Sequence, residues 1–157
     1  MKKYITFLLA TFIFSCKSVP ENQQITVASG GGITGVWHEY TLKADGQLLH
    51  KASNEDSATV VKTLSKSKTK DFFKQIEALK LNEKSVGEPG NMSYTVQFSE
   101  RKKFAHKVQW GDTKMPADSV KTFYDSFMEL VKWFSVKDEG NLKPYRGDML
   151  VEKNNAA

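Results

Sequence analysis

The chain has 157 residues, with 23 lysines and arginines against 18 aspartates and glutamates, which gives a formal net charge of +5. Only two of the basic residues are arginines, at positions 101 and 146, and the lysines are spread along the whole chain. Nucleic-acid-binding proteins usually concentrate arginine and aromatic residues on one face, so this composition excludes a nucleic-acid partner. The single cysteine, Cys16, excludes an internal disulfide, and the fold must therefore depend on its hydrophobic core.

The first residues have the layout of a secretory signal. Lysines at positions 2 and 3 are followed by an uncharged, largely apolar stretch over residues 4–15. This stretch is too short to cross a bilayer as a helix, which takes about 20 apolar residues. It ends in Ile13-Phe14-Ser15-Cys16, which resembles the bacterial lipobox: an aliphatic residue three positions before a cysteine and a small residue directly before it.

The lipobox resemblance implies that the signal (residues 1–15) is cleaved before Cys16 and that this cysteine is lipidated. Several acyl chains anchor a protein firmly, because each buried CH₂ contributes about 0.8 kcal/mol. No acidic residue follows the cysteine in Lys17-Ser18, which resembles lipoproteins sorted to the outer membrane. We therefore expect a cell-envelope protein with the membrane as a partner through its lipid anchor. The mature chain would keep 21 basic and 18 acidic residues, a net charge of +3.

Residues 16–23 are predicted to form a lipidated tether, and residues 24–134 a single domain. Alternating apolar residues predict strands at 25–27, 33–42, 47–51 and 59–64. Asp45-Gly46 predicts a tight turn between the second and third strands, because glycine readily supplies the positive φ that such turns require. The glycine run within residues 29–32 is predicted to interrupt the strands.

The apolar period then changes to that of helices. It predicts one helix over residues 68–81, capped by Ser67 or Thr69, and a second over residues 116–134 that starts at a proline. Between them, a loop at residues 82–91 precedes a second hairpin made of residues 92–98 and 104–110. Residues 135–157 are predicted to be a charged, partly disordered tail.

The expected fold class is α+β. The pattern predicts two layers, with a mainly antiparallel sheet of about six strands and two amphipathic helices on one face, in the order ββββαββα. Alternation in the strand at 33–42 places Trp37 and Glu39 opposite Tyr40 and Leu42, on the face that the helices leave open. An exposed aromatic residue with polar neighbours suits contact with a protein or a glycan. An indole packed under a loop or the tail is the alternative.

The glycine-rich segments are the other candidate binding elements. The run at residues 30–32 is not a phosphate-binding loop, because that chemistry needs glycines that open a helix, and here a strand follows. Dense glycines instead allow a partner backbone to approach closely. The predicted binding surface therefore joins the open sheet face to both glycine loops, and it comprises Trp37, Glu39, Gly30, Gly31, Gly32, Pro89, Gly90 and Asn91.

An enzyme is the weaker expectation, because no motif for a catalytic nucleophile occurs, and neither a cofactor nor a local metal site is predicted. A small hydrolase or metal-dependent enzyme would have to use His38 and His106 with acids such as Glu39 or Asp112. Buried, hydrogen-bonded histidines on the apolar face are the competing interpretation. A further hypothesis is an inhibitor or immunity-type protein that blocks a partner with a loop at residues 87–91.

Asp56-Ser57-Ala58 resembles the sequence that is O-glycosylated in exported proteins of Bacteroidota, with Ser57 as the acceptor in a predicted exposed loop. Together with its glycine-rich segments and lipobox, the chain resembles small uncharacterised lipoproteins of Bacteroidota. This resemblance implies no activity. We therefore expect a membrane-anchored envelope lipoprotein whose domain is a non-catalytic protein- or glycan-binding module.

Overall fold

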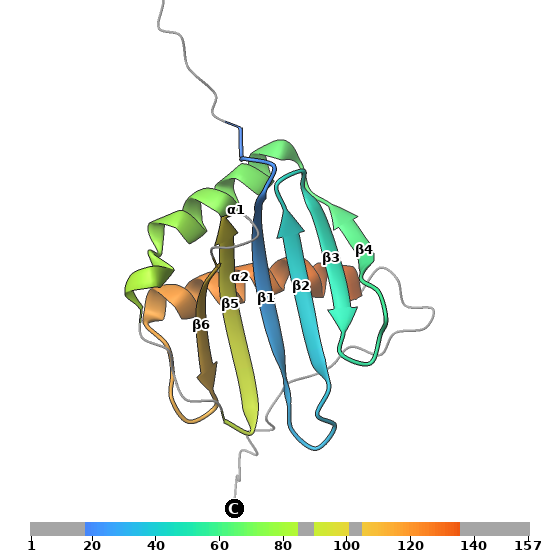
Figure 1. Ribbon diagram of the computed structural model, residues 1–157, viewed down its shortest axis with the longest axis vertical. Helices are drawn as coiled ribbons and strands as arrows, with labels where there is room; N and C mark the ends of the chain where they lie inside the picture. Colours follow the sequence, from blue (N-terminus) through green and yellow to red (C-terminus); the bar gives the residue numbers. More distant parts are fainter. Residues whose placement is uncertain (1–17, 85–89, 101–104, 136–157) are drawn as a thin grey trace, which may run out of the picture.

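The computed structural model describes residues 18–84, 90–100 and 105–135, which form two layers (Figure 1). One sheet of six antiparallel strands has the order β4-β3-β2-β1-β5-β6, and both helices lie on one face of it. The predicted α+β class and the order ββββαββα are confirmed. The elements are β1 (Gln23–Gly31), β2 (Trp37–Lys43), β3 (Gln47–Ala52), β4 (Thr59–Thr63), α1 (Lys66–Ala78), a 3₁₀ turn (Leu81–Glu83), β5 (Met92–Glu100), β6 (Ala105–Gly111) and α2 (Asp118–Ser135).

Strand β1 holds the sheet together, because it pairs with β2 on one side and with β5 on the other. Ile25 lies between Leu42 of β2 and Phe98 of β5, and Val27 is two residues further along. Successive side chains of a strand point to opposite faces. These apolar residues therefore share the inner face under the helices, where Ile25 and Val27 are fully buried.

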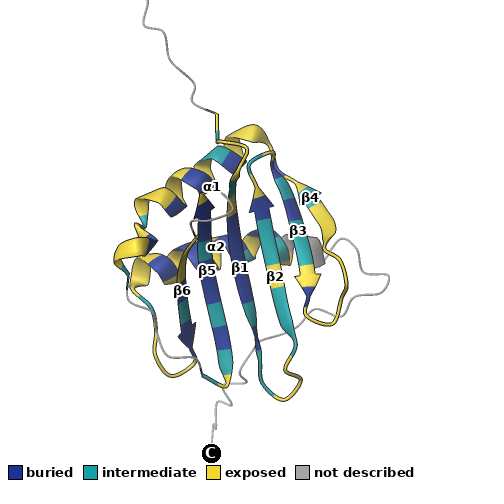
Figure 2. Cartoon of the chain, in the orientation of Figure 1, coloured by how far each residue is buried: buried dark blue, intermediate teal, exposed yellow. Residues whose placement is uncertain are grey.

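Aromatic side chains join the helices to each other and to the sheet. Phe72 of α1 meets Phe123 and Phe127 of α2 edge-on, with ring centroids 6.0 and 5.7 Å apart. Phe73 contacts Phe98 of β5 in the same manner at 6.3 Å. Edge-to-face contacts add favourable electrostatics to the burial of large apolar surfaces. Figure 2 shows the result, with buried residues concentrated in the central strands and exposed residues on β4, in the loops and along parts of α1.

Several element boundaries differ from the sequence prediction. Helix α1 ends at Ala78 rather than at residue 81, and helix α2 begins at Asp118, two residues after the predicted proline start. Strand β1 begins at Gln23 and continues through Gly31, because its glycines pair with β2 and β5 rather than interrupting the sheet. Strand β2 begins only at Trp37, so residues 32–36 form the hairpin loop. Helix α1 is capped by Ser65, whose side chain accepts a hydrogen bond from the Lys68 N–H, and the predicted caps two and four residues later are wrong.

The predicted turn at Asp45-Gly46 is confirmed. Gly46 has a φ of 93°, and the Asp45 side chain accepts a hydrogen bond of 2.9 Å from the Gln47 N–H. Several predicted features lie outside the described residues: the signal with Cys16, Pro89 and residues 136–157 of the tail. Within the described ranges, no helix has both the length and the apolar character needed to span a bilayer.

Truncating the central residue of the aromatic core tests this packing. Phe127→Ala should lower the free energy of unfolding by about 3–5 kcal/mol, because Phe127 is fully buried and its removal leaves a cavity. Urea denaturation followed by circular dichroism measures the change. Met115→Ala is the matched control, since Met115 is 64% exposed and its truncation should change stability by less than about 0.5 kcal/mol. Equal effects of the two substitutions would contradict the assigned core.

Candidate functional site

The two glycine segments predicted as binding loops lie side by side at one end of the sheet. We call this the distal end, because it lies opposite the end where the chain enters β1 (Figure 1). The Gly32 N–H donates a hydrogen bond of 2.8 Å to the Asn91 carbonyl. Gly31 has a φ of 111°, and a Cβ atom there would collide with the same carbonyl oxygen. At Gly90 a Cβ atom would be 2.9 Å from the Asp112 backbone nitrogen and would collide with the Asp112 carboxylate, so both segments require glycine for close backbone approach.

Trp37 lies on the open face of the sheet, as predicted, directly opposite Gly30. A Cβ atom added to Gly30 would be 2.7 Å from Cγ of the indole, so the ring covers the glycine backbone. The backbone of Trp37 is held from the other side, where its N–H donates to Ser53 Oγ at 3.1 Å and its carbonyl accepts from the Ser53 N–H at 2.8 Å. Trp37 is therefore half-buried rather than fully exposed, and its backbone is hydrogen-bonded to Ser53.

The rest of the open face is polar. Thr26 and Thr41 share a hydrogen bond of 3.2 Å across β1 and β2, and Thr41 also donates to the exposed Glu39 carboxylate at 3.4 Å. Beside them is a shallow hollow of about 170 Å³ over β1, β2 and β3. Its lining includes Glu39, Thr41, Lys43, Leu49 and Lys51. An open hollow lined by charged, polar and apolar side chains suits contact with a macromolecule better than enclosure of a substrate.

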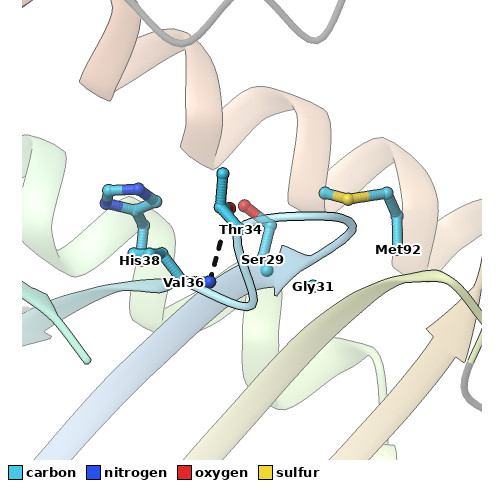
Figure 3. Close-up of a pocket in the computed structure, with 7 residues that line it drawn as sticks. Ser29, Gly31, Thr34, Val36, His38 and Met92 are labelled. Carbon is cyan, nitrogen blue, oxygen red and sulfur yellow. Dashed lines mark hydrogen bonds between the residues drawn. The ribbon is translucent and has the colours of Figure 1, made fainter. Parts of the chain in front are cut away.

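On the helix-covered side of the distal end, a second hollow of about 190 Å³ lies against the β1–β2 hairpin. Figure 3 shows Ser29, Thr34, His38 and Met92 projecting to the same side of the hairpin. Ser29 also hydrogen-bonds to Tyr124 of α2. Burial raises the pKa of Tyr124 to about 12, although this hydrogen bond acts in the opposite direction. The hollow is thus bounded by hydroxyl, imidazole and thioether groups.

His38 forms a pair with His50, which the sequence analysis did not identify. Their Nδ1 and Nε2 atoms are 3.1 Å apart, and the two rings are inclined by only 13°. The β2–β3 hairpin creates the pair, because its register sets Tyr40 opposite His50 and leaves His38 on the adjacent diagonal. The ring of Tyr40 also contacts His50, at a centroid distance of 4.7 Å. The turn at Asp45-Gly46 contained the necessary signal, since it implies this register.

Burial lowers the pKa of His50, and the neighbouring His38 lowers it further, while the Glu55 carboxylate has the opposite effect. Burial and, secondarily, Glu55 raise the pKa of Tyr40. Glu55 is fixed by the Ala52 N–H, which donates to its Oε2 atom at 2.8 Å. The pair therefore favours a neutral imidazole at His50, and the hydrogen bond to His38 requires that at least one of the two rings be neutral.

His38 and His106 do not converge. Strands β1 and β5 separate β2 from β6, and the registers set His38 level with Trp110, four residues from His106 along β6. Three strand spacings and four residues along the strand put the two histidines roughly 20 Å apart. His106 is exposed on the edge strand, which contradicts the interpretation of it as a buried histidine, and Asp112 is exposed beside Gly90. Among the described residues, no group of three or more His, Cys, Asp or Glu side chains is arranged to hold a metal ion. The enzymatic hypothesis based on His38 and His106 therefore has no shared pocket.

Two further candidates remain, and only the second is partly outside the described residues. Ser57 is exposed in the connection between β3 and β4, the setting that an O-glycosylation acceptor requires. Of the loop proposed for an inhibitor, residues 87–89 lie outside the described residues, while Gly90 and Asn91 belong to the distal end. The distal end also contains Ile33, which is 106% exposed at the tip of the β1–β2 hairpin and which the sequence analysis had placed in a strand.

The sequence matches no protein-family model and no curated protein.

The His38–His50 pair makes stability depend on pH. The folded-state pKa of His50 lies below the value of 6.5 that it has when unfolded, so the unfolded chain binds more protons. The contribution of His50 is present above pH 6.5 and should be lost as the pH falls from there toward the lowered pKa. Urea midpoints measured from pH 7.5 to pH 5 should fall for the wild type and fall less for His50→Gln. His106→Gln is the control and should follow the wild type; identical slopes for all three proteins would refute the prediction.

Proposed function

We propose that this protein is an envelope lipoprotein, anchored through Cys16 in the outer membrane, and that its domain is a non-catalytic binding module. Its contact surface is the distal end together with the adjoining open face around Trp37. The observation that carries the proposal is that this contact surface lies at the end of the sheet opposite the end where the chain enters β1. The segment that would lead to the lipid joins β1 at Gln23, whereas Trp37 and the glycine segments are at the other end of the strand.

This arrangement presents the contact surface away from the membrane. The nine residues of β1 extend about 27 Å, from a rise of roughly 3.3 Å per residue. A tether at one end of the sheet and a contact surface at the other end let the domain reach a partner without interference from the bilayer. The absence of a shared pocket for His38 and His106 also favours binding over catalysis.

A protein is the better-supported partner. Ile33 is an apolar side chain with no cover from the rest of the described chain, placed at the tip of a hairpin whose base is held by the glycine contacts. Burying such a side chain in a partner's pocket would contribute about 1.5–3 kcal/mol. The hollow of about 190 Å³ at this end is small and open, which suits a broad protein surface. An inhibitor of a partner enzyme is a special case, with the hairpin tip as the inserted element.

The lipid anchor is tested by substituting Cys16, the residue proposed to accept the lipid. Cys16→Ser should abolish incorporation of labelled palmitate into the full chain, because no other cysteine is present. Ser18→Ala should leave the labelling unchanged. Undiminished labelling of the Cys16→Ser chain would refute lipidation at this residue and would leave the binding surface to be tested separately.

The contact surface is tested by site-specific photo-crosslinking of the full chain in intact cells. A photoreactive amino acid in place of Ile33 or Trp37 should give a discrete protein adduct, because both side chains lie in the proposed contact. The same replacement at Val61, which is exposed on the edge strand β4, should give none. If no protein adduct forms, and if the wild type but not Trp37→Ala is retained on the host's surface polysaccharide, then the partner is a glycan rather than a protein. An adduct at Val61 alone would refute the surface.

A further inference from the structure

The histidine pair has the spacing of two ligands to one metal ion. A tetrahedral zinc ion with Zn–N distances of about 2.0–2.1 Å holds two nitrogens about 3.3–3.4 Å apart. Adjacent positions in tetragonal copper(II) coordination, with similar bond lengths, hold them about 2.8–2.9 Å apart. The observed Nδ1–Nε2 distance of 3.1 Å lies between these values. For the two to bind the same ion, each nitrogen needs to move by a few tenths of an ångström, and each ring must turn so that its lone pair points at the ion rather than at the other ring.

Burial keeps His50 neutral, the form that binds a metal ion, and two neighbouring side chains assist binding. Tyr40 packs against the His50 ring and restricts its position, so part of the ordering is already present before an ion binds. The Glu55 carboxylate is close enough to act electrostatically on both His50 and Tyr40, and its negative charge favours a bound cation. On the other side, His38 borders the 190 Å³ hollow, which gives water molecules room to complete the coordination.

We propose that His38 Nδ1 and His50 Nε2 together chelate one divalent transition-metal ion, and that copper(II) binds most tightly. Imidazole nitrogens suit copper, zinc and nickel, and copper(II) leads the affinity order for a site of this type. With both rings neutral, the bridging N–H hydrogen moves through solvent to the other nitrogen of its own ring. Both facing nitrogens then donate a lone pair to the ion, and no net proton is released. With only two protein ligands, the site retains open positions for water or for a ligand supplied by a partner.

Calorimetric titration of copper(II) and zinc into the full chain at pH 7.5 tests the proposal. Cys16→Ser serves as the background, because it removes a competing thiol ligand. One site is expected, with tighter binding of copper(II) than of zinc. His38→Ala and His50→Ala should each weaken binding at least tenfold, whereas His106→Ala, the matched exposed histidine, should leave it unchanged. Glu55→Gln should weaken it by a smaller factor.

A measurement on unsubstituted histidines covers the case in which a variant does not fold. Substoichiometric copper(II) should broaden the ring resonances of His38 and His50 in the NMR spectrum before those of His106, because a paramagnetic ion broadens the nuclei nearest to it. Three results would overturn the site: no binding at pH 7.5, undiminished binding in the His38→Ala/His50→Ala double variant, or broadening that begins at His106. None of these results bears on the crosslinking experiment, which tests the binding module independently.

Discussion

Strand β1 hydrogen-bonds to β2 along one edge and to β5 along the other, and it thereby joins the strands before α1 and the hairpin after it into a single sheet. Two smaller sheets would each have an additional open edge and would bury much less apolar surface. The register at Ile25, between Leu42 and Phe98, decides which face of both flanking strands is apolar. Because a shift of one residue would turn every inner side chain outward, this pairing also determines where the helices can pack.

The same strand creates the distal end by continuing into its glycines. Without a Cβ atom, Gly30 lets the indole of Trp37 lie on the strand, and Gly31 lets the chain approach the Asn91 carbonyl. The first contact comes from the pairing of β1 with β2 and the second from its pairing with β5, so the candidate surface is a continuation of the sheet. Side chains held in this way lose less conformational entropy on binding than flexible loops do.

The periodic elements were predictable from the sequence because burial on one face imposes a period that neighbouring residues share. Both helices, the Asp45-Gly46 turn and the opposite orientation of Trp37 and Tyr40 follow from such local patterns. The strand order was not predictable, since the pairing of β1 with β5 joins segments that are far apart in the sequence. The end of β1 was predicted wrongly because its glycines were taken to break the strand. They are needed there for close contact with Trp37 and Asn91, and local sequence preferences do not reveal those contacts. Predicting the pairing of His38 with His50 requires the register of the β2–β3 hairpin, because the two histidines are not close in sequence.

The position of the histidine pair on the inner face is itself informative. Further along the same strands, the inner positions are occupied by Leu42 and Leu48, which are fully buried. Two imidazoles at the rim of this core must be desolvated in part, and apolar residues of similar size would fill the space without that penalty. A pair retained only for packing would therefore be an unfavourable choice. Departures from the local apolar pattern concentrate at functional sites, and here the departure places two facing nitrogens 3.1 Å apart beside an open hollow. The chemistry that such a pair offers, donation of two lone pairs to one electrophile, is what apolar residues could not supply.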